Sequence, residues 1–174
     1  MGSESTRQPA RQPNVAAPQA AHELDAPPWL RVESTLMATA RLIREAYDKA
    51  LAPLSLNLTT ASMLAYVAER GPTTQTVLAD RMGIGRAAAG TAIDRLESRG
   101  LVERRPDSED RRVWLVTVTD TGVTVAADIA SIDGQVRSRL RRDVSREDRQ
   151  MLASLLVRLQ HNLISPNQPN GEPR

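Results

Sequence analysis

Apolar residues along most of this chain recur three or four positions apart, the spacing that places side chains on one face of an α-helix. Between residues 101 and 119 the pattern changes, because two short runs rich in Val, Leu and Trp flank a polar segment. That arrangement is typical of two strands joined by a hairpin. The pattern therefore predicts a mainly α chain of about six helices with one small antiparallel β-hairpin.

Residues that start and stop helices indicate where the first two helices lie. Pro28 suits the first turn of a helix of about 24 residues, which we expect to end before Pro53. Thr59 or Thr60 is the expected N-cap of the second helix, and Gly71 its stop.

The next two helices are short and close together. Thr74 is the expected N-cap of a helix over 75–82, and Gly83-Ile84-Gly85 then makes a tight turn whose glycines can adopt unusual backbone angles. The following helix begins at Arg86 and is expected to stop at Gly100. Two short helices joined by a glycine-containing turn predict a helix-turn-helix.

The helix from Arg86 has one apolar side and one open side. Ala89, Ile93 and Leu96 form a narrow stripe that we expect to be buried. The opposite side carries small and basic residues, namely Ala87, Ala88, Thr91, Arg95 and Ser98. Such a side suits a DNA major groove, which needs little bulk, some hydrogen bonding and positive charge. The alternative for this helix taken alone is an ordinary solvated surface helix.

A wing is predicted directly after this helix-turn-helix. Strands are expected over 101–105 and 113–119, and the polar loop 106–112 lies between them. Arg111 and Arg112 stand at the hairpin tip, from which a side chain can reach a narrow minor groove. The alternative for this arginine pair is a solvated hairpin. Residues 81–112 hold eight arginines against six acidic residues, so charge alone does not establish DNA binding.

The remaining chain divides into expected tails and long helices. Residues 1–28 and 165–174 are poor in large apolar side chains and are predicted to be disordered. A long helix is expected from Thr119 or Asp120, and the last helix follows a capping-box outline at Ser145 to Asp148. Apolar stripes of the first helix (29–52) and of the last two (120–164) exceed what a module over 55–119 can cover, which predicts a homodimer.

Composition excludes several kinds of site. The absence of cysteine rules out disulfides and zinc–thiolate centres, and His22 and His161 lie in or near the chain ends. We therefore expect no metal, no cofactor and no enzymatic activity. The sequence has no apolar run long enough for a membrane span and no signal peptide, so a cytoplasmic location without membrane contact is expected.

Three motifs resemble the MarR family of winged-helix regulators over about residues 36–163: 94–102 (DRLESRGLV), 107–112 (DSEDRR) and 118–122 (VTDTG). The resemblance implies an obligate homodimer, with repression that a small aromatic or amphipathic ligand or other signal relieves. It also implies that Arg112 enters the minor groove and that Asp110 braces the wing. The chain departs from many members at Ala88 and Gly90, so direct base readout is expected to be sparse.

The leading hypothesis is a sequence-specific transcriptional regulator, expected to be a repressor, that binds an inverted-repeat operator in double-stranded DNA. Its alternative is a winged-helix homodimer that acts as a protein-interaction adaptor without specific DNA binding. The expected DNA-binding residues are Thr73, Thr74, Gln75, Arg86, Ala87, Ala88, Thr91, Arg95, Arg104, Asp110, Arg111 and Arg112. A ligand pocket, for which ordinary core is the alternative, is expected from Met37, Ile43, Tyr47, Met63 and Tyr66.

Overall fold

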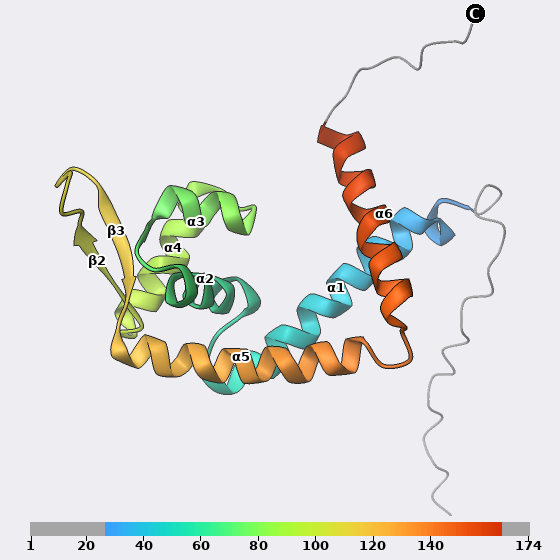
Figure 1. Cartoon of the computed structure of the whole chain (residues 1–174), viewed down its shortest axis with the longest axis horizontal. Helices are drawn as coiled ribbons and strands as arrows, with labels where there is room; N and C mark the ends of the chain where they lie inside the picture. The colour runs from blue at the N-terminus through green and yellow to red at the C-terminus, as the bar shows by residue number, and fades with distance from the viewer. Residues whose placement is uncertain (1–26, 165–174) are drawn as a thin grey trace, which may run out of the picture. The chain divides into compact units, whose positions relative to one another are not determined.

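The computed structural model describes residues 27–164, which contain six α-helices, two 3₁₀ turns and three short strands (Figure 1). The predicted tails, 1–28 and 165–174, lie outside the described residues except for Pro27 and Pro28. The chain divides into two compact units at Ile43, and each is described by itself below. The expectation of a mainly α fold with a small antiparallel wing is confirmed.

The first unit begins with a short turn and not with the expected α-helix. Pro28 opens the 3₁₀ turn η2 (Pro28–Leu30), and Arg31 is extended, with φ −72° and ψ 162°. Only then does α1 (Val32–Leu51) start, so the prediction of one helix from Pro28 was wrong. The hydroxyl of Ser34 donates to the Pro28 carbonyl and joins the two elements. The helix does end before Pro53, which lies in the first turn of η3 (Ala52–Leu54).

The second unit is built around α2 (Leu58–Arg70), which supplies five buried residues to the core. The expected N-cap at Thr59 or Thr60 was wrong. Asn57 caps the helix, because its side chain accepts from the Thr60 backbone N–H while the Thr60 hydroxyl accepts from the Asn57 N–H. This reciprocal pair satisfies two helix-end donors at once, and Gly71 follows the last turn as expected.

Helices α3 (Gln75–Met82) and α4 (Arg86–Ser98) form the predicted helix-turn-helix (Figure 1). Gly83 follows α3 in the left-handed region at φ +62°, where other L-residues are strained. Gly85 differs from expectation, because its φ of −64° is open to any residue, and it simply precedes α4. The Thr74 hydroxyl accepts from the Val77 N–H, which confirms the predicted cap of α3.

The wing is a three-stranded antiparallel sheet in the order β1-β3-β2. The expected hairpin consists of β2 (Val102–Pro106) and β3 (Trp114–Val118), and it extends beyond the helices in Figure 1. The additional strand β1 (Thr73–Thr74) was not predicted. It pairs with the far edge of β3 and connects the start of α3 to the wing.

The long helix α5 (Asp120–Leu140) starts where it was expected, with the Thr119 hydroxyl accepting from the Gly122 N–H. A Cβ at Gly122 would lie 2.0 Å from the Leu101 carbonyl oxygen, so only glycine fits this approach of α5 to the wing. In α6 (Arg146–Ile164) the Ser145 hydroxyl accepts from the Asp148 N–H, as the capping-box outline predicted.

The helices differ in how far they are buried. The core contains residues from the end of α1 and from α2, α3, α4, β2, β3 and α5, whereas α6 has no buried residue. Among residues 27–164, no single helix combines the length and hydropathy that a membrane span needs. Only the bent pair 32–54 and 58–70, with 71° between its members, meets both limits when its members are taken together.

Candidate nucleic-acid interface

The two sides of α4 are arranged as the sequence predicted. Ala89, Ile93 and Leu96 are at most 1% exposed and pack in the core. The residues of the opposite side are all exposed: Ala87, Ala88, Thr91, Arg95 and Ser98. The Thr91 hydroxyl donates to the Ala87 carbonyl, which leaves its oxygen lone pairs facing outward as acceptors. The Ser98 hydroxyl likewise donates to the Arg95 carbonyl, so this side of α4 offers methyl groups, two hydroxyl acceptors and arginine.

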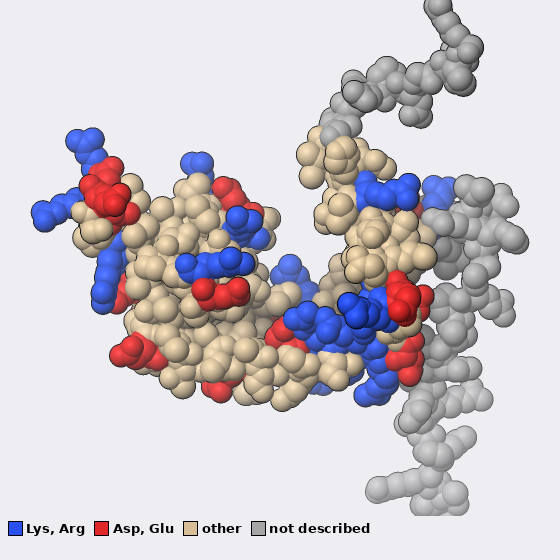
Figure 2. Space-filling view, viewed as in Figure 1, with Lys and Arg blue, Asp and Glu red and all other residues tan. Residues whose placement is uncertain are grey.

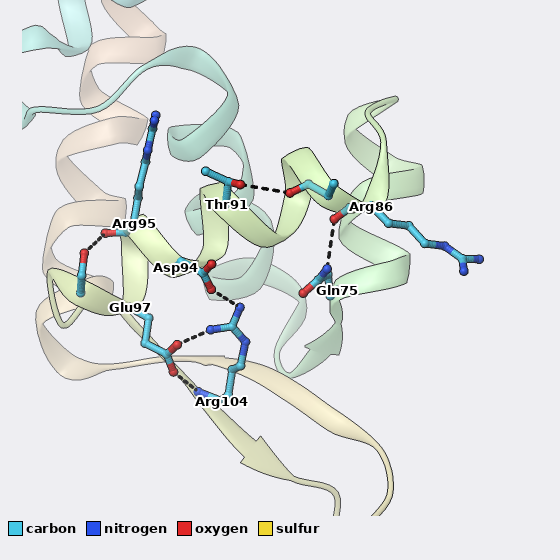
Figure 3. A network of polar contacts seen from close by, with 9 residues as sticks. Gln75, Arg86, Thr91, Asp94, Arg95, Glu97 and Arg104 are labelled. Atoms are coloured by element: carbon cyan, nitrogen blue, oxygen red, sulfur yellow. Dashed lines mark hydrogen bonds and ion pairs between the residues drawn. The ribbon is translucent and has the colours of Figure 1, made fainter.

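Gln75 holds the first turn of α4. Its side-chain Nε2 donates to the Arg86 carbonyl at 3.0 Å, as Figure 3 shows, so the amide is directed at α4. Gly90 leaves room for this contact, because a Cβ there would lie 3.1 Å from the same nitrogen. Gln75 was predicted to meet phosphate. In the structure its side-chain amide joins α3 to the first turn of α4. Gly90 likewise faces Gln75 and not the open side of the helix.

Thr73 and Thr74 lie half-buried at the junction of β1 and α3. The Thr74 hydroxyl is engaged in capping α3, so it is held beside the first turn. The first backbone N–H groups of a helix lack partners within the helix and can donate to an anion. What this junction can offer a phosphate is backbone N–H groups, and the Thr74 cap fixes the turn that carries them.

Arg104 connects the wing to α4. Its guanidinium binds Asp94 at 2.6 Å and Glu97 through the other terminal nitrogen, and its backbone N–H donates to Glu97 at 3.0 Å (Figure 3). Burial lowers the pKa of Arg104, but the hydrogen bonds and charges of Asp94 and Glu97 outweigh that effect and raise the pKa above its usual value.

The expectation that Arg104 meets phosphate does not fit this arrangement. The side chain is only 26% exposed and already carries two ion pairs, so a phosphate contact would have to break charge-assisted hydrogen bonds. Because Arg104 is on β2 and both acids are on α4, its position makes it a brace that holds the wing against α4.

The hairpin tip between β2 and β3 is organised by two aspartates. The Asp107 carboxylate accepts from the Glu109 N–H at 2.8 Å, and the Asp110 carboxylate accepts from the Arg112 N–H at 2.9 Å. These local bonds fix the turn without using an arginine side chain. The bracing of the wing by Asp110 that the family resemblance implied is therefore present, and it acts directly on the residue expected to enter the minor groove.

The arginines of this region divide into two groups. Arg104, Arg99 and Arg105 have intramolecular partners: besides the ion pairs of Arg104, Arg99 donates to the Leu54 and Ser55 carbonyls, and Arg105 pairs with Glu103 within β2. The side chains of Arg86, Arg95, Arg111 and Arg112 are exposed, and within residues 27–164 they form no ion pair. Figure 2 shows basic groups projecting from the hairpin tip around a small acidic cluster.

The five residues of the expected ligand pocket have different surroundings. Met63 is 0% exposed and belongs to the core, and Met37 is 74% exposed on α1. The Tyr47 hydroxyl donates to Asp133 at 2.8 Å. Burial, and to a lesser extent this hydrogen bond, raise the pKa of Tyr47 to about 12. Tyr66 and Ile43 are half-buried. Two shallow surface hollows, one on α6 and one along the end of α5, are lined by none of these five residues.

Two residues of this region were not predicted from the sequence. Arg99, which joins α4 to the segment before α2, was given no role. Trp114, at the start of β3, was counted only as a strand residue although it is 57% exposed. Its position two residues after Arg112 was the one available signal.

Comparison with known proteins identifies this arrangement. Residues 54–113 match the sequence model of the MarR family. The chain is 30% identical to the transcriptional regulator PA3341, and the alignment covers 75% of this chain and 96% of that one with a TM-score of 0.69.

Two further solved structures share the fold at lower identity. The S. aureus MepR–DNA complex is 16% identical, with 75% of this chain and 97% of that chain covered and a TM-score of 0.70. CouR from Rhodococcus jostii, bound to p-coumaroyl-CoA, is 23% identical, with 80% and 95% covered and a TM-score of 0.67.

Proposed function

Because the chain belongs to the MarR family of winged-helix regulators, we propose that it regulates transcription by binding double-stranded DNA as a homodimer. The observation that carries this is the division of the arginines. Arg104, which joins the wing to α4, is paired with two carboxylates. Arg86 and Arg95 on α4 and Arg111 and Arg112 at the wing tip are exposed and form no ion pair within residues 27–164. A DNA-binding surface needs such cations, since they replace the counterions of phosphate groups.

In this proposal α4 lies in the major groove and the hairpin tip reaches the adjacent minor groove. Ala87, Ala88 and Thr91 can touch thymine methyl groups, and Arg86 and Arg95 are the residues of α4 able to read guanine. Arg112 then reads the width of a narrow, A·T-rich minor groove. The start of α3 supplies backbone donors to phosphate, and the dimer requires an inverted repeat with half-sites about one helical turn apart.

The regulatory part of the proposal is repression that a small aromatic or amphipathic ligand relieves. CouR, which shares the fold, was solved with p-coumaroyl-CoA, and MepR was solved with DNA. Of the expected pocket residues in the second unit, Tyr47 and Tyr66 remain candidates for ligand contacts, because Met63 has no exposed surface. We further propose a cytoplasmic location and no enzymatic activity.

The test begins by recovering a DNA site with the purified protein through genomic footprinting. A duplex carrying that site and an unrelated duplex of equal length are then titrated by fluorescence anisotropy. Arg112→Ala is expected to weaken the recovered site about 10- to 100-fold, which corresponds to losing roughly 1–3 kcal/mol of recognition. Its preference over the unrelated duplex should fall as well, because a residue that reads groove width discriminates between sequences.

Arg70→Ala is the matched control. It removes the same charge from an exposed side chain at the end of α2, where Arg70 pairs with Glu69. Its affinity for both duplexes should stay within about twofold of the wild type. The proposal fails if no site is protected, or if the wild-type protein binds both duplexes equally well.

A further inference from the structure

Trp114 is a large aromatic side chain with 57% of its surface exposed, and it lies at the start of β3 beside the hairpin tip. The chain has only two tryptophans and no phenylalanine. Single exposed apolar residues are common on protein surfaces, so exposure alone carries no conclusion. The position of Trp114 in the sheet is more informative.

The strand register places Trp114 on the same face of the wing as Arg104. Residues directly opposite each other in an antiparallel pair point to the same face, and alternate residues along a strand share it. The pairs on this face are Val102 with Val118, Arg104 with Val116, and Pro106 with Trp114. Arg104 reaches α4 through Asp94 and Glu97, so this face is the one directed at the recognition helix.

Burial along this face decreases toward the tip. Val102 and Val116 are buried, Arg104 is half-buried, and Pro106 and Trp114 are exposed. The inner part of the face is thus covered by the protein's own core, and the outer part presents a proline and an indole ring. Arg111 and Arg112 lie on the loop three and two residues before Trp114, so the uncovered apolar pair is near exposed cations.

We propose that Trp114 and Pro106 pack against the sugar–phosphate backbone of one DNA strand. This inference rests on the proposed function, because a helix in the major groove and a wing tip in the adjacent minor groove have one backbone between them. The deoxyribose rings of that backbone are apolar, and its phosphates lie within reach of the neighbouring arginines. Trp114 therefore adds affinity and positions the wing, but it reads no sequence.

Acrylamide quenching tests the contact directly. In the Trp29→Phe protein, Trp114 is the sole tryptophan, since the chain has two. Its Stern–Volmer constant should fall about threefold or more when the footprinted duplex is added, because the bound backbone covers the ring. Anisotropy of a label on the same duplex reports binding independently.

The outcomes of this measurement separate the two proposals. If the duplex binds but quenching stays at its DNA-free value, the backbone contact is wrong and the proposed function stands. If no duplex binds the wild-type protein, both are overturned. Protection that appears on raising the protein concentration without DNA would show that a second copy covers the ring, and that result also overturns the contact.

Substitution gives a second readout. Trp114→Ala is expected to weaken the footprinted and the unrelated duplex by the same factor, about tenfold, and to leave the salt dependence unchanged because no charge is removed. Trp114→Phe should recover most of the affinity. The control is Arg70→Ala, which truncates an exposed side chain at the end of α2, outside the wing and the expected dimer helices, and should change affinity less than twofold. A loss confined to the footprinted duplex would overturn the proposed sequence-independent role.

Discussion

Helices α4 and α6 have opposite relations between apolar content and burial. The apolar side chains of α4 are mostly alanines, yet Ala89, Ala92, Ile93 and Leu96 are buried. The sequence of α6 contains five leucines, and none of its residues is buried. Leu155 is 46% exposed and Leu163 is 82% exposed, whereas Ile93 is 0% exposed.

The difference shows that an apolar stripe predicts that one side of a helix will be buried, but not which element or partner buries it. Helix α4 contacts α2, α3 and β2, which bring core residues to its apolar side. The stripe of α6 has no such cover within the described residues of this chain. A contiguous apolar surface of this kind is typical of a protein–protein interface, which agrees with the proposed homodimer. Variants of α4 and α6 test this contrast directly, and two further variants test contacts that join other elements.

The largest expected effect is Ile93→Ala in α4. Removing a fully buried side chain from the core should lower the free energy of unfolding by about 2–5 kcal/mol. The matched control is Ile164→Ala in α6, where the isoleucine is 80% exposed and the expected loss is below about 0.5 kcal/mol. Urea unfolding at one protein concentration measures both, and equal losses would contradict the contrast.

The double substitution Leu152→Glu with Leu155→Glu should abolish dimerisation. Sedimentation of the wild type at micromolar concentration should give about twice 19.1 kDa, and the variant should sediment as a single chain, because charge cannot be buried without a partner. Gln150→Glu with Gln160→Glu adds the same charge at exposed polar positions of α6 and should remain dimeric. A monomeric wild type would refute the prediction outright.

Arg104→Met should loosen the wing at a smaller cost. Loss of the ion pairs to Asp94 and Glu97 is expected to reduce the free energy of unfolding by about 1 kcal/mol and to speed amide exchange in β2. The matched control is Arg111→Met, which removes an exposed arginine at the tip and should change neither quantity. Unchanged exchange in the Arg104 variant would show that the brace contributes nothing.

The smallest effect is expected from Tyr47→Phe and appears only at alkaline pH. The pKa of Tyr47 is raised to about 12, so between about pH 10 and 12 the folded chain retains a proton that the unfolded chain has lost. Stability therefore falls as pH rises through this range, and the phenylalanine variant should show a shallower fall. Thermal unfolding from pH 9 to 11.5 measures it, and identical slopes would argue that the bond to Asp133 does not persist in solution.

Local signals explain why much of the fold was predicted from the sequence. The caps at Thr74, Thr119 and Ser145 each act on a residue three positions away, so the donor and acceptor are visible together in the chain. The cap of α2 was misassigned because Asn57, Thr59 and Thr60 are all competent, and the reciprocal bond between Asn57 and Thr60 decided the outcome.

The apolar spacing and turn residues of the sequence determined that α4 would be a helix with one buried and one open side. Only the tertiary structure decided which polar side chains around that helix already have partners within the protein. Arg104 and Arg112 look equally available in the sequence, but packing of β2 against α4 brings Arg104 to two carboxylates. Gln75 also looks available to DNA in the sequence, but the turn between α3 and α4 brings its side chain to the Arg86 carbonyl. The physical reason is distance along the chain: hydrogen bonds within a few residues follow from local conformation, whereas those between separate elements form only after the core has set their positions.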